Sequence, residues 1–160
     1  MQMSRFTLYF VIFLSLFSFR CLSAQTIFLE AEGFKDKGGW VLDNQFYESV
    51  GSGFLLAHGT GIPVKNAQTS FQVDQQGQYY LFVRTRDWMS KWDPNHRYTP
   101  GKFNISIDGK LCDSIFGTQS RDWKFQRGGK IYLSKGSHSI SLIDLEGYGA
   151  RCDAIVLTKD

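Results

Sequence analysis

The chain has 160 residues, of which 42% are hydrophobic, 16% aromatic and 21% charged. This length predicts a single domain. Of the 18 basic residues, Arg5 and Arg20 lie among the first 24 residues, so 16 basic and 15 acidic residues remain beyond them, a net charge of about +1. The remaining basic residues form no stripe or cluster, which argues against a nucleic-acid-binding protein.

Residues 1–24 have the three parts of a secretory signal peptide. Arg5 precedes an apolar run over 6–19, and the small-residue stretch Leu-Ser-Ala that follows predicts cleavage after the last of these residues. A transmembrane anchor is the alternative, but the run is shorter than the roughly 20 residues that span a bilayer. A lipoprotein signal is not expected, because bulky and charged residues precede Cys21. We therefore expect a secreted or periplasmic protein without a membrane segment after cleavage.

Residues 25–160 are predicted to form one β-sandwich module. Short runs rich in Ile, Val, Phe, Tyr and Leu alternate with clusters of Gly, Asn, Asp and Ser, and no segment keeps a helical apolar period for three turns. The expected strands are 27–34, 40–44, 53–58, 67–73, 78–87, 102–108, 111–116, 123–127, 129–134, 138–145 and 152–158. About ten short strands at this spacing predict an all-β fold, a jelly-roll sandwich.

The alternation of side chains predicts which strands have a solvated face. Apolar and polar residues alternate over 103–108 and over 139–142, so each of these strands should have one wet face. The run YYLFV at 79–83 is apolar on both faces, as expected of a central strand that is covered twice. Asp108-Gly109 predicts a tight hairpin.

Two carboxylates stand close together in the first expected strand. In a strand, Glu30 and Glu32 would point to the same face about 7 Å apart, where like charges repel unless a positive charge lies beside them. A calcium ion would satisfy both, because it takes hard oxygen ligands in flexible geometry. A solvated strand edge is the alternative, and the pair taken alone favours it.

A third carboxylate opens the last apolar strand. Asp153 stands where that strand becomes buried, and a buried carboxylate needs a partner. The candidates are a backbone cap, Arg151, or a cation shared with the first strand.

The stretch 86–101 lies between two expected strands and combines aromatic and polar residues, as a recognition loop does. The tripeptide Arg-Asp-Trp occurs in it at 86–88 and again at 121–123. Sugar rings stack on flat aromatic side chains, while Asp, Asn, Arg and Gln bond to their hydroxyls. The candidate ligand-binding residues are Trp88, Trp92, Asp93, Asn95, His96, Tyr98, Arg121 and Trp123. Core packing is the alternative for each tryptophan, and it is favoured for Trp40.

Motifs of independent enzymes are absent from the sequence. There is no metalloprotease helix signature, nucleophile elbow or phosphate-binding loop, and the glycines of 51–64 are expected in turns. His58 and His138 are expected to be structural, and no histidine has a metal ligand at the required spacing. A catalytic role for Asp87, Asp93 and His96 is a weaker alternative. Cys112 and Cys152 either pair, as exported cysteines can, or remain free thiols.

The segments FLEAEGF at the start and RCDAIVLT at the end resemble the galactose-binding-like β-sandwiches found among carbohydrate-binding modules. In that family a structural calcium lies between the first and last strands. The resemblance therefore implies a calcium held by Glu30, Glu32 and Asp153.

A further resemblance covers most of residues 27–160. The blocks that carry it are GGWVLDNQF, GSGFLLAHGTGIPV, YYLFVRTRDW, PGKFNISIDGK, FGTQSRDWKFQRGGKIYL and LIDLEGYGARCDAIVLT. In this order they resemble the N-terminal sandwich module of exported Bacteroidetes-type FAD-dependent oxidoreductases. No FAD is expected in this chain, because a flavin domain would need its own dinucleotide fold.

Together these features predict an exported, non-catalytic module that binds an oligo- or polysaccharide and supports a partner enzyme at glycan. The alternative is a structural or docking N-terminal domain, or a fragment, of an FAD-dependent oxidoreductase or a glycan-degrading enzyme. In that case the same aromatic residues would be buried between domains.

Overall fold

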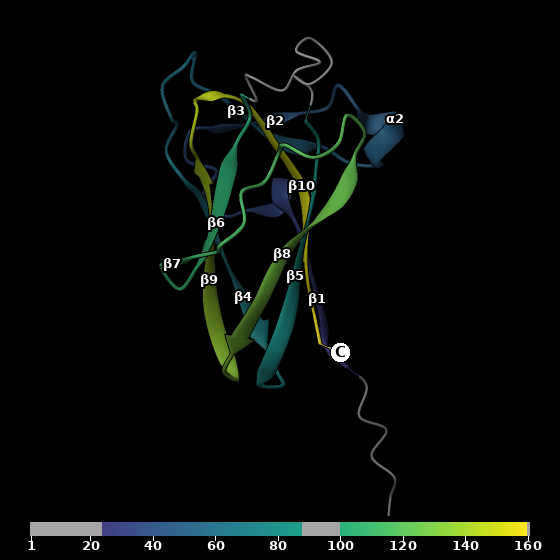
Figure 1. Ribbon diagram of the computed structural model, residues 1–160, viewed down its shortest axis with the longest axis vertical. Coiled ribbons are helices and arrows are strands. Elements are labelled where there is room, and N and C mark those ends of the chain that lie inside the picture. Colours follow the sequence, from purple (N-terminus) through teal and green to yellow (C-terminus); the bar gives the residue numbers. More distant parts are fainter. Residues whose placement is uncertain (1–23, 88–99, 160) are drawn as a thin grey trace, which may run out of the picture.

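The protein, seen in a computed structural model that describes residues 24–87 and 100–159, is a β-sandwich (Figure 1). Two antiparallel sheets pack face to face, which confirms the predicted all-β fold. The strands are β1 (Thr26–Glu30), β2 (Trp40–Asp43), β3 (Phe54–His58), β4 (Ala67–Val73), β5 (Gly77–Thr85), β6 (Phe103–Ile107), β7 (Lys110–Leu111), β8 (Lys124–Leu133), β9 (Gly136–Asp144) and β10 (Tyr148–Thr158). A 3-10 turn, η1 (Ala31–Gly33), and a short helix, α2 (Tyr47–Val50), interrupt the strands.

β10 organises the larger sheet. That sheet has six strands in the order β2-β3-β10-β5-β8, with β1 as a further partner of β10. One edge of β10 pairs first with β3 and then with β1, while the other edge pairs with β5. The smaller sheet has the order β4-β9-β6-β7.

The start of the first strand lies beside the end of the last strand. β1 and β10 pair from Thr26 opposite Thr158 to Glu30 opposite Ala154, and the hydroxyl oxygens of the two threonines lie 2.9 Å apart. The loop end is at the opposite pole of the molecule (Figure 1). We define it by three segments: 44–53 around α2, 85–87 at the end of β5, and 117–123 before β8.

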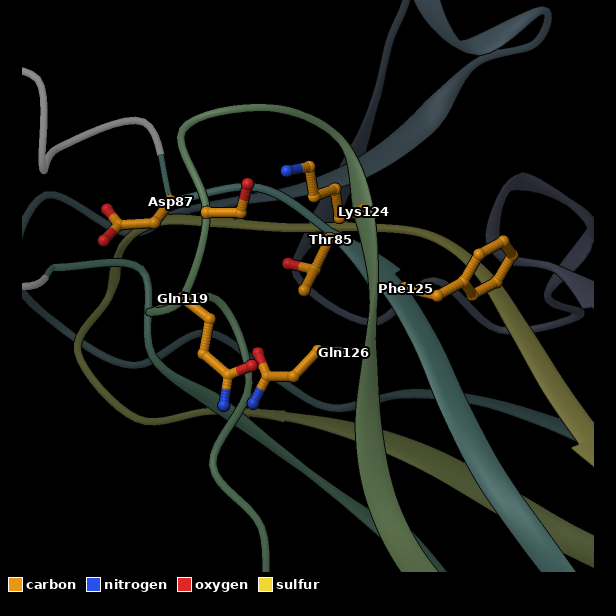
Figure 2. A pocket seen from close by; sticks show the side chains of 7 residues that line it. Thr85, Asp87, Gln119, Lys124, Phe125 and Gln126 are labelled. Atoms are coloured by element: carbon orange, nitrogen blue, oxygen red, sulfur yellow. The ribbon is translucent and has the colours of Figure 1, made fainter.

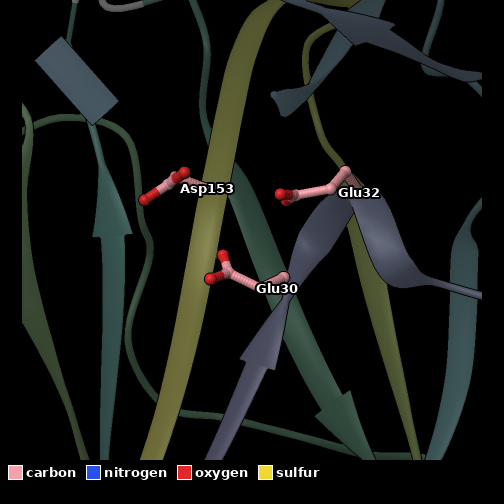
Figure 3. A group of neighbouring side chains, drawn as sticks. All are labelled: Glu30, Glu32 and Asp153. Atoms are coloured by element: carbon pink, nitrogen blue, oxygen red, sulfur yellow. The ribbon is translucent and has the colours of Figure 1, made fainter. Parts of the chain in front are cut away.

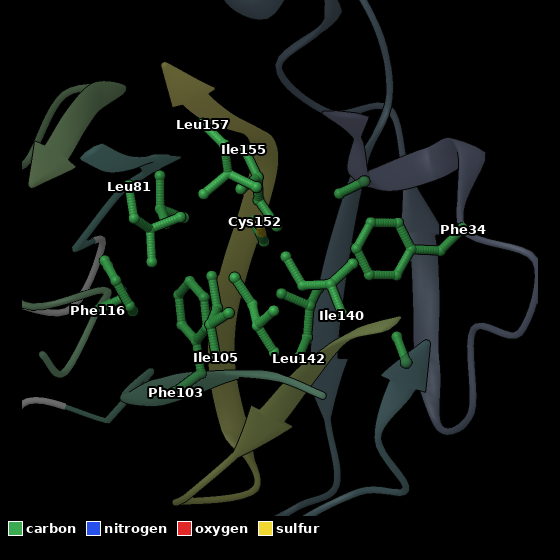
Figure 4. Packing of buried hydrophobic residues seen from close by; sticks show 14 of the residues in the cluster. Phe34, Leu81, Phe103, Ile105, Phe116, Ile140, Leu142, Cys152, Ile155 and Leu157 are labelled. Atoms are coloured by element: carbon green, nitrogen blue, oxygen red, sulfur yellow. The ribbon is translucent and has the colours of Figure 1, made fainter. Parts of the chain in front are cut away.

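The core lies between the sheets and is built from the inward side chains of both (Figure 4). Trp40 on β2 is buried against Phe103 on β6, with ring centroids 5.7 Å apart in an edge-to-face arrangement that joins the two sheets. The core assignment of Trp40 is therefore confirmed. Its other large members include Phe34, Leu55, Tyr79, Leu81, Ile105, Phe116, Ile140, Leu142, Ile155 and Leu157.

Several expected strand limits were wrong. β1 ends at Glu30. Within the expected strand 111–116, Leu111 pairs as part of β7 and Phe116 pairs in an isolated bridge with Phe103. The expected strands 123–127 and 129–134 are the single strand β8, which absorbs the glycine pair as a bulge: Phe82 pairs with Arg127 and Leu81 with Gly129. A glycine pair between two strand-like runs indicates a turn or a bulge equally well, and pairing with the long strand β5 favours the bulge.

Two expected faces also differ. Tyr80 and Phe82 on the outer face of β5 are half-buried, so this strand is only partly covered on its second side. Asn104 and Ser106 on β6 are buried, because the segment after β7 folds back along this strand: the Asn104 amide donates to the carbonyl of Cys112 at 3.1 Å. The alternation expected in 139–142 is present, with Ile140 and Leu142 in the core.

Cys112 and Cys152 are both free thiols, half-buried and buried respectively. Burial raises the pKa of Cys112 to about 11, so this thiol is unreactive at neutral pH. No helix among residues 24–87 and 100–159 is long and apolar enough to cross a membrane.

Candidate functional site

Three carboxylates meet where β1 ends beside β10. Oxygens of Glu30, Glu32 and Asp153 lie within 4.8 Å of one another, and Figure 3 shows the two glutamates extending toward Asp153. The strand geometry assumed for the two glutamates was wrong. The chain turns into η1 after Glu30, and this turn directs Glu32 toward the same point. We call this group the acidic cluster.

A bulge in β10 places Asp153 in the acidic cluster. Cys152 pairs with Thr85 but Ala154 pairs with Arg84, so Asp153 is the extra residue in the ladder. The neighbouring Cys152 packs in the core. Asp153 is only 1% exposed, and it accepts a hydrogen bond from the Ser52 hydroxyl at 3.3 Å.

Arg84 is the cation that contacts the acidic cluster. Its Nη1 lies 3.2 Å from Asp153 Oδ2, so three carboxylates and one guanidinium have a formal charge of −2 when all are ionised. Arg84 also donates to the carbonyls of Val50 at 3.2 Å and Ser49 at 3.3 Å, at the C-terminal end of α2. The guanidinium is thus shared between Asp153 and α2.

The acidic cluster is electrostatically strained. The pKa of Asp153 is raised to about 6, chiefly because the carboxyl is buried; Arg84 lowers this pKa, while the charges of Glu30 and Glu32 raise it. Burial and the charge of Glu32 also raise the pKa of Glu30. Oε2 of Glu32 is buried and has no hydrogen-bond partner among the described residues. Hard oxygen ligands, excess negative charge and an orphaned oxygen together fit a divalent cation such as Ca²⁺.

A second pair of charged groups lies in the smaller sheet. His138 donates from Nδ1 to Asp108 Oδ2 at 2.6 Å and from Nε2 to the carbonyl of Ser134 at 2.9 Å. Both partners are acceptors, so the doubly protonated ring satisfies both, and these bonds raise the pKa of His138 against the effect of burial. Asp108 and Gly109 both have positive φ, which confirms the predicted hairpin. These contacts agree with the structural role expected for His138.

The loop end brings Arg86 and Asp87, the described part of the first Arg-Asp-Trp segment, close to the segment that precedes β8. The Asp87 amide donates to the carbonyl of Ser120 at 2.6 Å, which ties the end of β5 to the segment before β8. The guanidinium of Arg86 stacks over the ring of Phe46, 4.3 Å from its centroid.

Trp123 belongs to the aromatic packing of the loop end. It is half-buried, and its ring lies 4.9 Å from that of Phe54 and 6.1 Å from that of Phe46, measured between centroids. It therefore offers a ligand much less ring area than an open platform would. Arg121, two residues earlier, is exposed.

A small pocket lies next to these segments (Figure 2). Its volume is about 190 Å³, and its lining residues are Thr85, Asp87, Gln119, Ser120, Lys124, Phe125 and Gln126. Gln126 is only 5% exposed, and its Nε2 donates to the carbonyl of Ile115. Its Oε1 is buried and has no hydrogen-bond partner among the described residues. We call this cavity the loop-end pocket.

Six predicted ligand-binding residues lie outside the described residues. They are Trp88, Trp92, Asp93, Asn95, His96 and Tyr98. Gln119, Lys124 and Gln126 line the loop-end pocket but are not among the residues predicted from the sequence. Their proximity to Asp87 depends on β5 pairing with β8 and on the Asp87–Ser120 hydrogen bond, and a linear sequence shows neither.

No protein-family model and no curated protein matches the sequence, but solved structures share its fold. A native family 35 carbohydrate-binding module from Clostridium thermocellum matches with a TM-score of 0.64 at 14% identity, over 84% of this chain and 98% of that module. A family 35 module from an environmental isolate matches with a TM-score of 0.58 at 17% identity, over 84% and 93%.

The same fold occurs as part of longer enzymes. The Podospora anserina GH26-CBM35 β-(1,4)-mannanase matches with a TM-score of 0.63 at 16% identity, over 84% of this chain and only 28% of the enzyme. At these identities the likeness concerns the fold alone. The chain has the two-sheet antiparallel jelly roll of family 35 carbohydrate-binding modules, which is a galactose-binding-like sandwich.

Proposed function

We propose that this chain is an exported, non-catalytic module that binds carbohydrate through the loop-end pocket and supports a partner enzyme domain at glycan. The fold supports the proposal, because the solved structures that share it include family 35 carbohydrate-binding modules and a mannanase that contains one. The observation that carries it is the buried, unpartnered Oε1 of Gln126 in a pocket next to exposed polar groups.

The loop-end pocket suits a small polyhydroxylated ligand. An unpaired buried oxygen costs about 1–3 kcal/mol, and a ligand hydroxyl would remove that cost by donating to it. Gln119 and Lys124 supply further polar groups, while the ring of Phe125 points away from the pocket (Figure 2). About 190 Å³ is below the roughly 300–1,000 Å³ of pockets for drug-sized ligands, so the pocket would take one sugar unit.

Isothermal titration of the mature module with plant and host oligosaccharides tests this proposal. Gln126→Met keeps the length of the side chain and removes the amide, so we expect up to about tenfold weaker binding. Gln68→Met, on an exposed position of β4, is the matched control and should bind as the unmodified module does. Thermal melting of each variant separates lost binding from lost folding, because the substitution also removes the Gln126–Ile115 bond.

Two results would contradict the proposal. One is the absence of heat with every sugar. The other is undiminished affinity in a folded Gln126→Met variant, which would place the glycan contact elsewhere.

We also propose that the acidic cluster holds a structural Ca²⁺. Glu30, Glu32 and Asp153 would supply carboxylate oxygens, and a dication would balance their residual charge of −2 beside Arg84. Bound calcium would hold the end of β1 against β10 and would need no part in chemistry. The ligand set stays a proposal tested by the calcium titration described in the Discussion.

Two classes of partner enzyme are predicted for this chain. The enzymes that share the fold include a mannanase, which supports a glycan-degrading partner. Association with an FAD-dependent oxidoreductase rests on the sequence resemblance, and export rests on residues 1–24.

A further inference from the structure

A groove of about 520 Å³ runs along the side of the sandwich, between the outer strands of the two sheets. One wall comes from β8, the outer strand of the larger sheet, and the other from β7 and the residues that follow it (Figure 1). Buried Leu81, Ile107 and Leu133 line its base. We call it the side groove. It shares no lining residue with the loop-end pocket.

The bulge in β8 leaves the wall of the side groove open. Gly129 has φ +98°, and no atom lies within 4 Å of the place where a Cβ would stand. At Gly128, by contrast, a Cβ would meet Leu81 and Phe116 at 2.7 Å, so this glycine fits against the core. A glycine backbone facing open space allows a ligand to approach the strand closely.

The rim of the side groove has both apolar and hydrogen-bonding groups. Tyr132 is 60% exposed on one side and Leu111 is 55% exposed on the other. The side chains of Gln78, Asp113 and Ser114 line the groove and make no hydrogen bond with another described residue. An exposed ring beside free donors and acceptors is the combination that sugar recognition uses.

Charge favours a neutral ligand. The groove is lined by two lysines, Lys110 and Lys130, and two aspartates, Asp108 and Asp113, so their formal charges cancel. Lys130 already lies over the ring of Tyr80, 4.7 Å from its centroid, and Asp108 is held by His138. A strongly charged ligand would therefore find no excess of opposite charge.

A protein strand fits the side groove less well. β8 is an edge strand, but it has Lys124, Arg127 and Lys130 together with the bulge, and these features prevent pairing with another chain. The volume lies within the roughly 300–1,000 Å³ of small-molecule sites.

We propose that the side groove is a second carbohydrate site, which takes a neutral segment of a glycan chain with one sugar ring against Tyr132. The inference relies on the proposed function only for the class of ligand. Two sites on one module would strengthen binding to a polymer through effective concentration, without new contacts.

Nitrogen-15 NMR of the mature module tests the site, with mannohexaose, cellohexaose, xylohexaose and laminarihexaose as probes. We expect at least one to shift the amides of Leu111, Ser114 and Gly129. Tyr132→Ala should abolish these shifts and weaken binding of the matching polymer by about tenfold or more. Phe28→Ala removes another ring, 54% exposed but outside the groove, and should leave both unchanged.

The pattern of shifts separates this proposal from the previous one. Shifts at Gln119 and Lys124 alone would overturn the side groove and leave the loop-end pocket standing. Shifts at neither place would overturn both sites. Groove shifts that persist in Tyr132→Ala would also overturn the proposal, because the ring would then not contact the sugar. An otherwise unchanged amide spectrum of this variant shows that it keeps the fold.

Discussion

Asp108 and Asp153 stand in opposite electrostatic surroundings. Asp108 accepts hydrogen bonds from His138 and from the backbone of Ser139, and these bonds lower its pKa although burial opposes them. Burial and two neighbouring carboxylates raise the pKa of Asp153. Asp108 has His138 as its own counter-charge, whereas Asp153 and the two neighbouring glutamates have the single charge of Arg84 beside them. This difference supports the calcium ion that we propose for the acidic cluster.

Calcium binding tests this contrast and should give the largest effect. At about 100 times its Kd, Ca²⁺ should raise the free energy of unfolding by about 2.7 kcal/mol and raise Tm accordingly. Glu32→Gln should lose most of this response, because the substitution removes a negative ligand from the acidic cluster. Scanning calorimetry with Ca²⁺ and with a chelator measures both.

Glu48→Gln is the matched control for calcium, because Glu48 is exposed on α2 and outside the acidic cluster. It should keep the full response. An equal rise in Tm for Glu32→Gln would show that calcium acts elsewhere.

The second test removes His138, the cation that pairs with Asp108. His138→Gln should lower the free energy of unfolding by about 2 kcal/mol at about pH 5.5, because hydrogen bonds to charged groups contribute about 1.5–3 kcal/mol. Urea unfolding with and without Ca²⁺ should give the same loss, since Asp108 has no part in the acidic cluster.

His58→Gln is the control for His138→Gln. His58 is exposed, so its substitution should change stability by less than about 0.5 kcal/mol. A loss of similar size for both histidines would mean that the Asp108–His138 pair adds little.

The smallest expected effect is the pH dependence of the same pair. The pKa of His138 is raised in the folded protein, so its contribution is fully present below the ordinary value of 6.5 and falls as pH rises through the folded value. The pKa of Asp108 is lowered, so its contribution is present above the ordinary value of 3.8 and falls as pH drops through the folded value.

Urea titrations of the unmodified module and His138→Gln between about pH 4 and pH 9 measure this dependence. Their difference in stability should be largest between about pH 4 and pH 6.5 and should narrow toward pH 9. A difference that stays constant across the range would indicate lost packing on Phe71, whose ring stacks on His138.

The fold could be predicted from the sequence because its strands alternate locally and its turns have the residues that turns need. The hairpin at Asp108-Gly109 and the inward residues of β9 follow from such local rules. The bulges in β8 and β10 do not, because each depends on pairing with β5. The helix α2 was also missed, since four residues are too few for a periodic pattern.

The acidic cluster was predicted for a partly wrong reason. Alternation in a strand suggested that Glu30 and Glu32 share a face, whereas η1 brings Glu32 into place. Asp153 was predicted as a third ligand because the segment around it resembles carbohydrate-binding modules and because a carboxylate in an apolar strand needs a partner. Gln126 and the side groove had no such signal, because each depends on segments that meet only in the folded sandwich.

The start of β1 and the end of β10 lie side by side, and this has a consequence for protein engineering. Since Thr26 and Thr158 lie side by side, the whole sandwich can be inserted into a surface turn of another protein, or circularly permuted with a short bridge, without stretching either strand. A host attached at this pole would leave the loop end facing outward. The same arrangement makes the module suitable as an interchangeable cassette, with its orientation set by the host.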